Sequence, residues 1–474
     1  MPKKLIPFII VFCSLLMASL ACRFISRADP TATPVPAVET AEEVVVLPTD
    51  TPTPEPTEEI AEIVTEEVVE EEEIEEVATP GRGVVEGMEK SMWIQEDSYV
   101  YVAFLYENES RDILYEDVMF SISLFDESGK LLYDEYINTP WLFPEQTVGM
   151  FSSVWLEVDM SPVASVTATF SYENTTEPGE LVHPFTTEGI VYWPDDGYGM
   201  VTGRIVNNEE ITFTNLQVYA ICYDTAGEIV GGGFTYVDFI HLDDYMGFTM
   251  YVDTIGEVDS VEVFPMLSYS TQFIDKTDFL TEIIILDDYF YPNEWGYLVG
   301  GFTLRNETAD VLNNSLIYVT FYDAQLNITA TSTSYIDLLL PGDTLGIAPW
   351  VSTPPRGAET VEYDILILPG EPVDDYELDF NPFRVDSTTV TGDFEDYVLV
   401  NFTNTYNKEV SDLDVYVLVY NADGRIIGGG WDWTRESIPA GDSFEIEVWV
   451  SYADAETIDR VEAWVVPTFW TEFE

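Results

Sequence analysis

The sequence has few of the residue types that cross-linking and catalysis need. It holds 3 cysteines and 2 histidines among 474 residues. Cys13 and Cys22 lie close to the N-terminus, so only Cys222 remains in the part expected to fold, and no intrachain disulfide is available there. Domains of about 100 residues can fold without such a cross-link. The folded part must therefore depend on its own hydrophobic core.

Basic residues are scarce as well. Lys and Arg total 17 against 88 Asp and Glu, which gives a formal net charge of −71 at pH 7. Phosphate contacts need a basic surface, so this balance excludes nucleic acid as a partner. It also disfavours adsorption to anionic lipid. We interpret the excess of acid as a source of solubility and as protection of exposed sheet edges.

The first 22 residues have the pattern of an export signal. Lys3 and Lys4 are followed by the apolar run 5–20 and by a small-residue site that ends at Cys22. This pattern resembles a bacterial lipoprotein signal, which implies that Cys22 carries lipid and anchors the protein in a membrane. We then expect it in the cell envelope, on the outer face of the cytoplasmic membrane or at the cell surface. A cleaved signal peptide and a short uncleaved anchor are the alternatives.

Residues 23–81 have the composition of a disordered linker. They are rich in Pro, Thr, Glu and Val and almost lack aromatic residues, so they cannot bury enough apolar surface to fold alone. Proline and like charges both favour extended chains, which predicts a spacer. The apolar residues at 60, 63, 64 and 68 have helical spacing, so a partner-binding helix over 58–77 is the alternative.

The rest of the chain repeats with a period near 100 residues. Asn108, Asn207, Asn306 and Asn404 are separated by 99, 99 and 98 residues, and each precedes a polar turn. This period is too long for a solenoid unit but suits an independently folding domain. We therefore predict four domains, joined like beads on a string, over 82–177, 178–275, 276–376 and 377–474.

Each repeat has the pattern of β-strands. Val118, Phe120, Ile122 and Leu124 alternate with other residues, and the period of two predicts a strand with one face inward. The many short strands and the absence of long helical periods predict an all-β chain of four antiparallel, immunoglobulin-like β-sandwiches.

Several turn and strand residues have expected structural roles. Glycine closes most of the hairpins, and where Leu326 replaces it we expect Asn327 to adopt the left-handed conformation. The repeated asparagine tolerates such a backbone and can close an Asx turn, so we interpret it as structural. The glycine runs 231–233 and 428–430 lack the Lys-Ser/Thr of a phosphate loop and predict bulged or twisted edge strands.

The ends of the second main strands carry a family resemblance. The segments 122–126 (ISLFD), 220–224 (AICYD), 319–323 (VTFYD) and 417–421 (VLVYN) resemble the FxLYD domain of bacterial envelope proteins. None has Phe at the first position. The resemblance implies exported sandwich modules and supplies no catalytic residues.

Candidate catalytic residues are few. His183 and His241 lie at unrelated positions, Cys222 is expected to face inward, and no nucleophile elbow, His-Glu-x-x-His or paired-cysteine motif occurs. A glycosidase with two carboxylates stays open in so acidic a chain, but a small sandwich offers no obvious deep cleft. We predict a protein that is not an enzyme and has no cofactor.

Binding sites have two weak candidate signals. Acidic pairs near predicted turns could bind calcium, although none has the spacing of a dedicated calcium loop: Asp195, Asp196, Asp243, Asp244, Asp287, Asp288, Asp374 and Asp375. Exposed aromatic rings can stack on the apolar faces of sugars, and the candidates are Trp431 and Trp433, with Tyr219, Tyr318 and Tyr416 on outward strand faces.

The sequence thus predicts an envelope lipoprotein that displays four β-sandwiches as a binding or spacing module. An array that binds carbohydrate, or an adhesion module stiffened by calcium, is the alternative. A protein or glycan of the envelope is the expected partner.

Overall fold

The computed structural model describes residues 81–473, apart from short gaps at 157–161, 179–182, 195–198, 243, 275–282, 294–295, 356–357, 375, 393–395 and 453–456. The leader over 1–22, Cys22 and all of the linker predicted over 23–81 except its last residue therefore lie outside the described residues. Residues 76–474 form one compact unit. Its described residues contain strands and turns but no helix, so the prediction of an all-β chain is confirmed.

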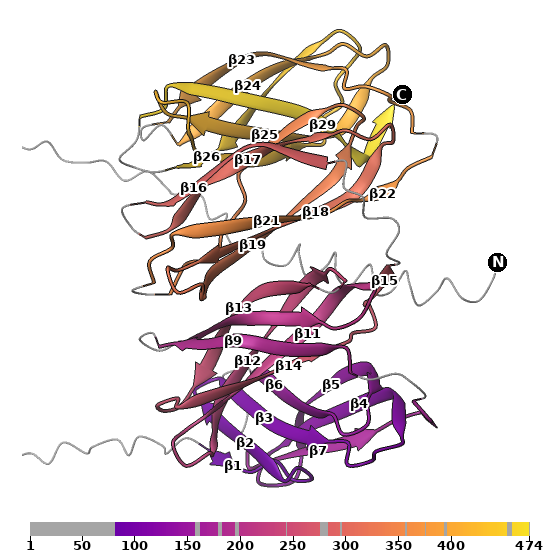
Figure 1. Cartoon of the computed structure of the whole chain (residues 1–474), viewed down its shortest axis with the longest axis vertical. Helices are drawn as coiled ribbons and strands as arrows, with labels where there is room; N and C mark the ends of the chain where they lie inside the picture. Colours follow the sequence, from indigo (N-terminus) through magenta and orange to yellow (C-terminus); the bar gives the residue numbers. More distant parts are fainter. Residues whose placement is uncertain are drawn as a thin grey trace, which may run out of the picture. The chain divides into compact units, whose positions relative to one another are not determined.

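The strands form four consecutive groups, which we call repeats 1 to 4 (Figure 1). Repeat 1 contains β1 (Arg82–Gly83), β2 (Lys90–Glu96), β3 (Tyr99–Glu107), β4 (Leu114–Phe125), β5 (Leu131–Leu142), β6 (Thr147–Trp155), β7 (Ser165–Ser171) and β8 (Asn174–Thr176). Repeat 2 contains β9 (Phe185–Trp193), β10 (Gly199–Asn207), β11 (Thr212–Tyr223), β12 (Ile229–Ile240), β13 (Tyr245–Thr254), β14 (Ser260–Met266) and β15 (Phe273–Ile274).

The other two groups follow the same order. Repeat 3 contains β16 (Ile283–Pro292), β17 (Leu298–Asn306), β18 (Leu312–Tyr322), β19 (Ile328–Leu339), β20 (Thr344–Ile347), β21 (Glu362–Leu368) and β22 (Glu371–Pro372). Repeat 4 contains β23 (Phe383–Thr391), β24 (Tyr397–Asn404), β25 (Val410–Tyr420), β26 (Ile426–Thr434), β27 (Ser443–Trp449), β28 (Ser451–Tyr452) and β29 (Arg460–Phe473).

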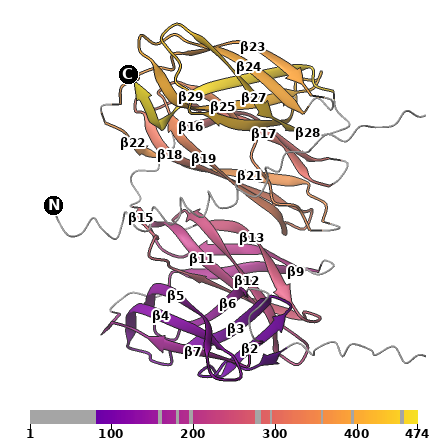
Figure 2. The same cartoon turned by 180° about the vertical axis from the view of Figure 1, so that it is seen from behind.

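Each repeat has two antiparallel layers with one strand order, and in repeat 2 the pairing of β12 with β13 joins the layers into one seven-stranded sheet. In repeat 1 the first layer runs β1-β2-β3-β6 and the second β5-β4-β7, and Figure 2 shows the second layer from the opposite side of the molecule. Layers β9-β10-β13 and β12-β11-β14, β16-β17-β20 and β19-β18-β21, and β23-β24-β27 and β26-β25-β29 repeat this order. The chain therefore alternates between layers, and each layer's inner face supplies half of a core.

The core follows the alternation in the sequence. Val118, Phe120, Ile122 and Leu124 on β4 are all fully buried, and the rings of Phe104 on β3 and Phe120 lie 5.9 Å apart across the two layers. Burying a side chain of this size contributes about 1.5–3 kcal/mol. Inward-facing apolar residues on both layers therefore hold each repeat together.

The repeated asparagine ties the two layers of each repeat at one end. Asn207, which ends β10, is 1% exposed. Its Nδ2 donates hydrogen bonds to the carbonyl oxygens of Ile211 (2.7 Å) and His241 (2.9 Å), just outside the two ends of the β11–β12 hairpin. Its Oδ1 accepts the N–H of Glu209 at 3.0 Å, which closes the expected Asx turn.

The equivalent asparagines make the same bonds, to the carbonyls of Ile113 and Phe143, of Asp310 and Leu339, and of Lys408 and Ile438. None of the four asparagines has a positive φ. The expected Asx turn is present. The asparagine is needed because its side chain donates two hydrogen bonds and accepts one, and not because it adopts a left-handed backbone.

One turn prediction is wrong. Leu326, not Asn327, takes the left-handed conformation, with φ 64°, at the place where Gly129, Gly227 and Gly424 close the other hairpins. For a residue with Cβ this conformation costs roughly 1–2 kcal/mol. The Leu326 carbonyl accepts a hydrogen bond from the Arg204 guanidinium of repeat 2 at 2.9 Å, so the strained turn is part of a contact between repeats.

The glycine runs mark the corner where the two layers meet. Gly231 pairs with Cys222 on β11 and also with Thr254 on β13, and a Cβ at Gly231 would lie 2.0 Å from the Asp253 carbonyl oxygen. Gly428 approaches the Ser451 carbonyl oxygen in the same way. The predicted bulge is present beside Cys222, but these glycines are paired on both sides and are not on a free edge.

Successive repeats are joined through the outward face of the second main strand. Tyr219, Tyr318 and Tyr416 occupy equivalent positions on β11, β18 and β25 and are 5%, 4% and 6% exposed. Each belongs to the hydrophobic cluster of the preceding repeat, and the Tyr318 hydroxyl donates to the Gly247 carbonyl of repeat 2 at 2.7 Å. The repeats are therefore packed on one another, unlike the beads on a string that the period suggested.

The first layer of each preceding repeat makes room for this contact with a glycine. A Cβ at Gly149 would lie 2.7 Å from Ile221, one at Gly247 2.7 Å from Thr320, and one at Gly346 2.7 Å from Leu418 and 2.3 Å from Trp464. The three glycines occupy equivalent positions in their repeats, and so do the residues Ile221, Thr320 and Leu418 that they contact. One joint geometry is thus used between repeats 1 and 2, 2 and 3, and 3 and 4.

The two ends of the array lack the joint residues. Repeat 1 has Ser121 where the later repeats have the buried tyrosine, and repeat 4 has the exposed Glu445 where the earlier repeats have glycine. In stacked arrays, terminal units with polar outer faces keep the array soluble, and Ser121 and Glu445 fit that pattern.

We predict that Asn207→Ala lowers the free energy of unfolding by about 2–3 kcal/mol, because two partly buried carbonyls lose their donor. Denaturant unfolding of the purified protein measures the change. The control is Asn208→Ala, which removes an exposed amide bonded to the Pro184 carbonyl and should cost under about 1 kcal/mol. Equal losses in the two variants would refute a special role for the buried amide.

We predict that Gly346→Glu opens the joint between repeats 3 and 4, since the new side chain collides with Trp464 and buries a charge. The loss should be roughly 2–4 kcal/mol, with a red shift of tryptophan fluorescence before global unfolding. The matched control is Glu445→Gly at the equivalent position of repeat 4, where no further repeat is stacked. A Gly346→Glu protein that unfolds like the parent would contradict the joint.

Candidate functional site

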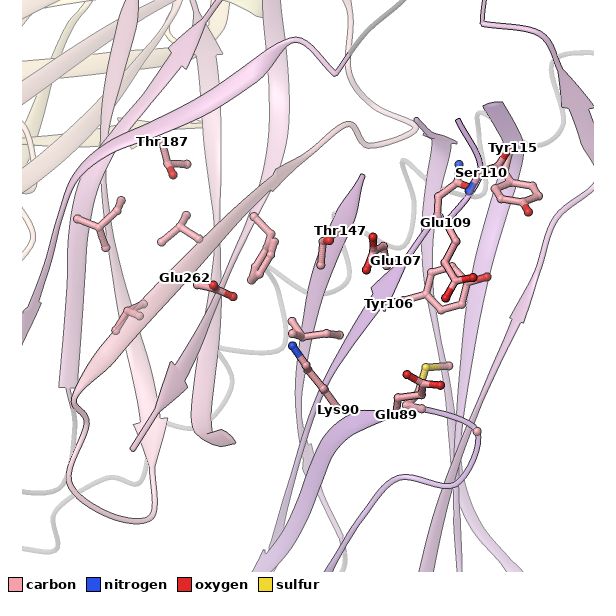
Figure 3. Close-up of a pocket in the computed structure, with 18 residues that line it drawn as sticks. Glu89, Lys90, Tyr106, Glu107, Glu109, Ser110, Tyr115, Thr147, Thr187 and Glu262 are labelled. Atoms are coloured by element: carbon pink, nitrogen blue, oxygen red, sulfur yellow. The ribbon is translucent and has the colours of Figure 1, made fainter. Parts of the chain in front are cut away.

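A groove lies where repeat 1 meets repeat 2. It has a volume of about 800 Å³, and we call it the acidic groove because its polar lining includes Glu89, Glu107, Glu109, Glu262 and a single base, Lys90. Figure 3 shows Glu262 and Thr187 on the repeat 2 side, opposite Glu107 and Tyr106 of repeat 1. Leu105 and Phe264 supply an apolar floor. This lining suits a polar or cationic group.

The acidic groove holds no arrangement typical of catalysis. Burial raises the pKa of Tyr106, and the neighbouring Tyr115 and Glu109 raise it further, so the phenol stays neutral at ordinary pH. Glu262 accepts a hydrogen bond from the Tyr223 hydroxyl at 2.8 Å, which engages one of its oxygens in the joint. The groove therefore has hydrogen-bonding capacity but no activated nucleophile among its lining residues.

A second groove lies where repeat 2 meets repeat 3. It has a volume of about 380 Å³, and we call it the neutral groove. Its lining consists of hydroxyl and aromatic residues: Thr235, Tyr236, Phe248, Thr249, Tyr251, Tyr318, Thr331, Ser332, Thr333, Trp350, Ser352 and Thr353. Tyr236, Tyr251 and Trp350 are 55%, 58% and 80% exposed. Large exposed rings beside hydroxyl groups are the strongest ligand-binding signal in the described residues.

The acidic pairs do not gather into a metal site in the part of the chain that the structure describes. Asp195, Asp196, Asp243 and Asp375 lie outside the described residues. Asp244 accepts the N–H of Tyr245 at 2.8 Å, Asp288 accepts the Tyr363 hydroxyl, and Asp287 and Asp374 are exposed. No three acidic, histidine or cysteine side chains among the described residues are placed to hold a metal ion.

The two candidate tryptophans stack on each other. The rings of Trp431 and Trp433 on β26 lie 5.3 Å apart with an angle of 26° between their planes, and Trp431 is 46% exposed. Trp431 also lies 6.4 Å from the ring of the buried Tyr416 on β25. The pair thus covers part of the joint between repeats 3 and 4, so less ring surface is free for a ligand than the sequence suggested.

The candidate catalytic residues have structural surroundings. Cys222 is fully buried, as its inward position predicted, and burial raises the pKa of its thiol to about 12. Both ring nitrogens of His183 lie within 3.1 Å of backbone carbonyl oxygens, and His241 contacts the Ile367 carbonyl at 3.3 Å. Burial lowers the pKa of both histidines. Cys222 and His183 therefore support the packing of repeat 2, and His241 contacts β21 of repeat 3 across the joint.

The joint between repeats 3 and 4 contains a buried carboxyl group that the sequence did not reveal. Asp414 is 7% exposed. Burial, together with the charge of Asp337 on repeat 3, raises the pKa of Asp414 to about 7. The Tyr416 hydroxyl donates a hydrogen bond to Asp414 Oδ2 at 3.3 Å, and the Trp431 side chain is a second hydrogen-bond partner. Asp337 is itself raised in pKa by burial. Two carboxyls at one joint favour the protonated form.

Neither groove could be found from single repeats. Each groove is lined by residues from two repeats, about 100 positions apart in the sequence, that come together only through the joint. Trp350 was an available signal, because this large aromatic residue follows strand β20 in a stretch rich in Ser, Thr and Pro.

We predict that Asp414→Asn stabilises the protein at pH 8 and has little effect at pH 4. The pKa of Asp414 in the folded protein, about 7, lies above the ordinary 3.8. The protonated carboxyl therefore contributes its full stabilisation of the fold below about pH 4, and this contribution is lost as the pH rises through 7. The gain at pH 8 should be on the order of 2 kcal/mol. Denaturant unfolding at both pH values tests this, with the exposed Asp423→Asn as control. A gain independent of pH would exclude the protonated carboxyl.

The chain was compared with known proteins. No protein-family model matches it, and no curated protein matches it either. The resemblance to the FxLYD domain and to a lipoprotein signal therefore has no support from a family model, whereas the all-β architecture with several antiparallel sheets rests on the structure itself.

Proposed function

We propose that this protein is a non-enzymatic lipoprotein of the cell envelope that displays four β-sandwich repeats as a binding or spacing module. The observation that carries the proposal is the repeated joint, in which a buried tyrosine and a matching glycine stack each repeat on the one before. Such stacking favours a scaffold that holds its surfaces in fixed relation over a catalytic body built around one deep pocket.

The strand order supports the finer description of the repeats. With β2, β3 and β6 in one layer and β5, β4 and β7 in the other, repeat 1 has the Greek-key alternation of immunoglobulin-like sandwiches without their disulfide. Such sandwiches commonly serve as cell-surface modules. The FxLYD resemblance agrees with this assignment.

The N-terminal region supplies the proposed anchor. The leader pattern, lipidation at Cys22 and the acidic linker over 23–81 together would hold the repeats outside the membrane, on its outer face or at the cell surface. A chain with a net charge of −71 would be repelled by anionic headgroups, so lipid is the plausible means of attachment.

We predict that Cys22→Ser moves the full-length protein from the membrane fraction to the soluble fraction. Each acyl methylene contributes about 0.8 kcal/mol to membrane affinity, so loss of the lipid removes nearly all of it. Fractionation of cells followed by immunoblotting measures the partition. The control is Cys13→Ser, which changes the other leader cysteine and should leave the protein in the membrane. Membrane retention of the Cys22→Ser protein would refute lipid anchoring.

A further inference from the structure

The neutral groove differs from its surroundings in charge. The chain carries 88 acidic residues, yet none of the described residues that line this groove is charged. The acidic groove at the preceding joint, by contrast, is lined by four glutamates and a lysine. An uncharged, hydrogen-bonding lining in so acidic a chain favours a ligand that is itself uncharged and polar.

The hydroxyl groups of the neutral groove are held in place by hydrogen bonds to one another and to backbone carbonyls. Thr249 of repeat 2 and Thr331 of repeat 3 have their Oγ1 atoms 2.8 Å apart, and Ser352 Oγ donates to the Thr331 carbonyl at 3.0 Å. Ser332 Oγ donates to the Trp350 carbonyl at 2.6 Å. Hydroxyls fixed in this way can exchange hydrogen bonds with ligand hydroxyls at little cost in side-chain entropy.

The aromatic rings provide the apolar contacts. Tyr236 comes from β12, Tyr251 from β13 and Trp350 from the segment after β20, and each exposes more than half of its surface. Such rings are costly to leave in water unless they meet a partner. Sugars present apolar C–H faces and polar hydroxyl edges on the same ring, so a lining of flat aromatics and hydroxyls matches both.

We propose that the neutral groove between repeats 2 and 3 binds an uncharged saccharide chain. Trp350 and Tyr251 stack on the sugar rings, Tyr236 bounds the site, and the Thr249, Thr331 and Ser352 hydroxyls contact the ligand's hydroxyl edge. The groove volume of about 380 Å³ lies at the lower end of the range for small-ligand sites, which suits a short stretch of such a chain. The inference rests on the proposed function and names the ligand of its binding module.

Native affinity electrophoresis tests the site. Full-length protein in a polyoxyethylene detergent is run in gels that contain dextran, xyloglucan or galactomannan as uncharged probes, or polygalacturonate as an anionic probe. We expect retardation by at least one uncharged polysaccharide and none by polygalacturonate. Trp350→Ala and Tyr251→Ala should each raise the apparent Kd at least about tenfold, because each removes a stacking ring.

A matched control lies at the equivalent position of another repeat. Trp449 occupies in repeat 4 the position of Trp350 and is 47% exposed, so Trp449→Ala should leave binding unchanged. Because Trp350 is 80% exposed, its replacement should not disturb folding, which far-ultraviolet circular dichroism checks. Thr331→Val is a second variant that leaves the aromatic rings in place and should weaken binding.

Three results would overturn the site. These are no retardation by any of the uncharged probes, retardation that survives both Trp350→Ala and Tyr251→Ala, and retardation lost instead in Trp431→Ala or Trp433→Ala. Membrane partition of Cys22→Ser is measured separately from these gels. A failed saccharide test therefore leaves the anchored scaffold standing, and a failed anchoring test leaves the saccharide site standing.

Discussion

The buried asparagine at the end of the first layer is the constraint on which each repeat depends. Hydrophobic burial brings the two layers together but does not fix which strand ends meet, because apolar contacts are not directional. The amide of Asn207 supplies direction, since it meets one acceptor beside β11, one beside β12 and one N–H of its own turn at the same time. A shift of either layer would leave buried polar groups without partners.

The fixed layers in turn make the joint possible. Tyr318 reaches the Gly247 carbonyl only if the outward face of β18 has one register relative to β13, and that register is set inside each repeat. Glycine is required there because a Cβ at Gly247 would overlap Thr320 and Ile328. Ser121 of repeat 1 and Glu445 of repeat 4 stand at the positions where the other repeats have the joint tyrosine and the joint glycine.

The sequence was sufficient to predict the fold because its signals are local. Alternation along β4, turn glycines and the period of the asparagines all describe contacts within one repeat, and the structure agrees with them. The left-handed Leu326 could not be anticipated, because its turn is held by Arg204 of the neighbouring repeat. Positive φ angles inside the second main strands were equally hidden, because a polar residue there has the sequence pattern of an ordinary outward-facing strand residue. The residues concerned are Asp117, Asn215, Asn314 and Asp412.

The candidate sites were harder to predict because they belong to pairs of repeats. Outward tyrosines look like exposed platforms until the preceding repeat covers them, and Tyr219, Tyr318 and Tyr416 are in fact buried. The same stacking explains why equivalent residues can differ in role. Trp350 and Trp449 occupy one position of the repeat, and Trp350 lines a groove together with Tyr236 and Tyr251 of repeat 2. In such an array, the acidic and neutral grooves lie at joints, where two copies with different substitutions form one surface.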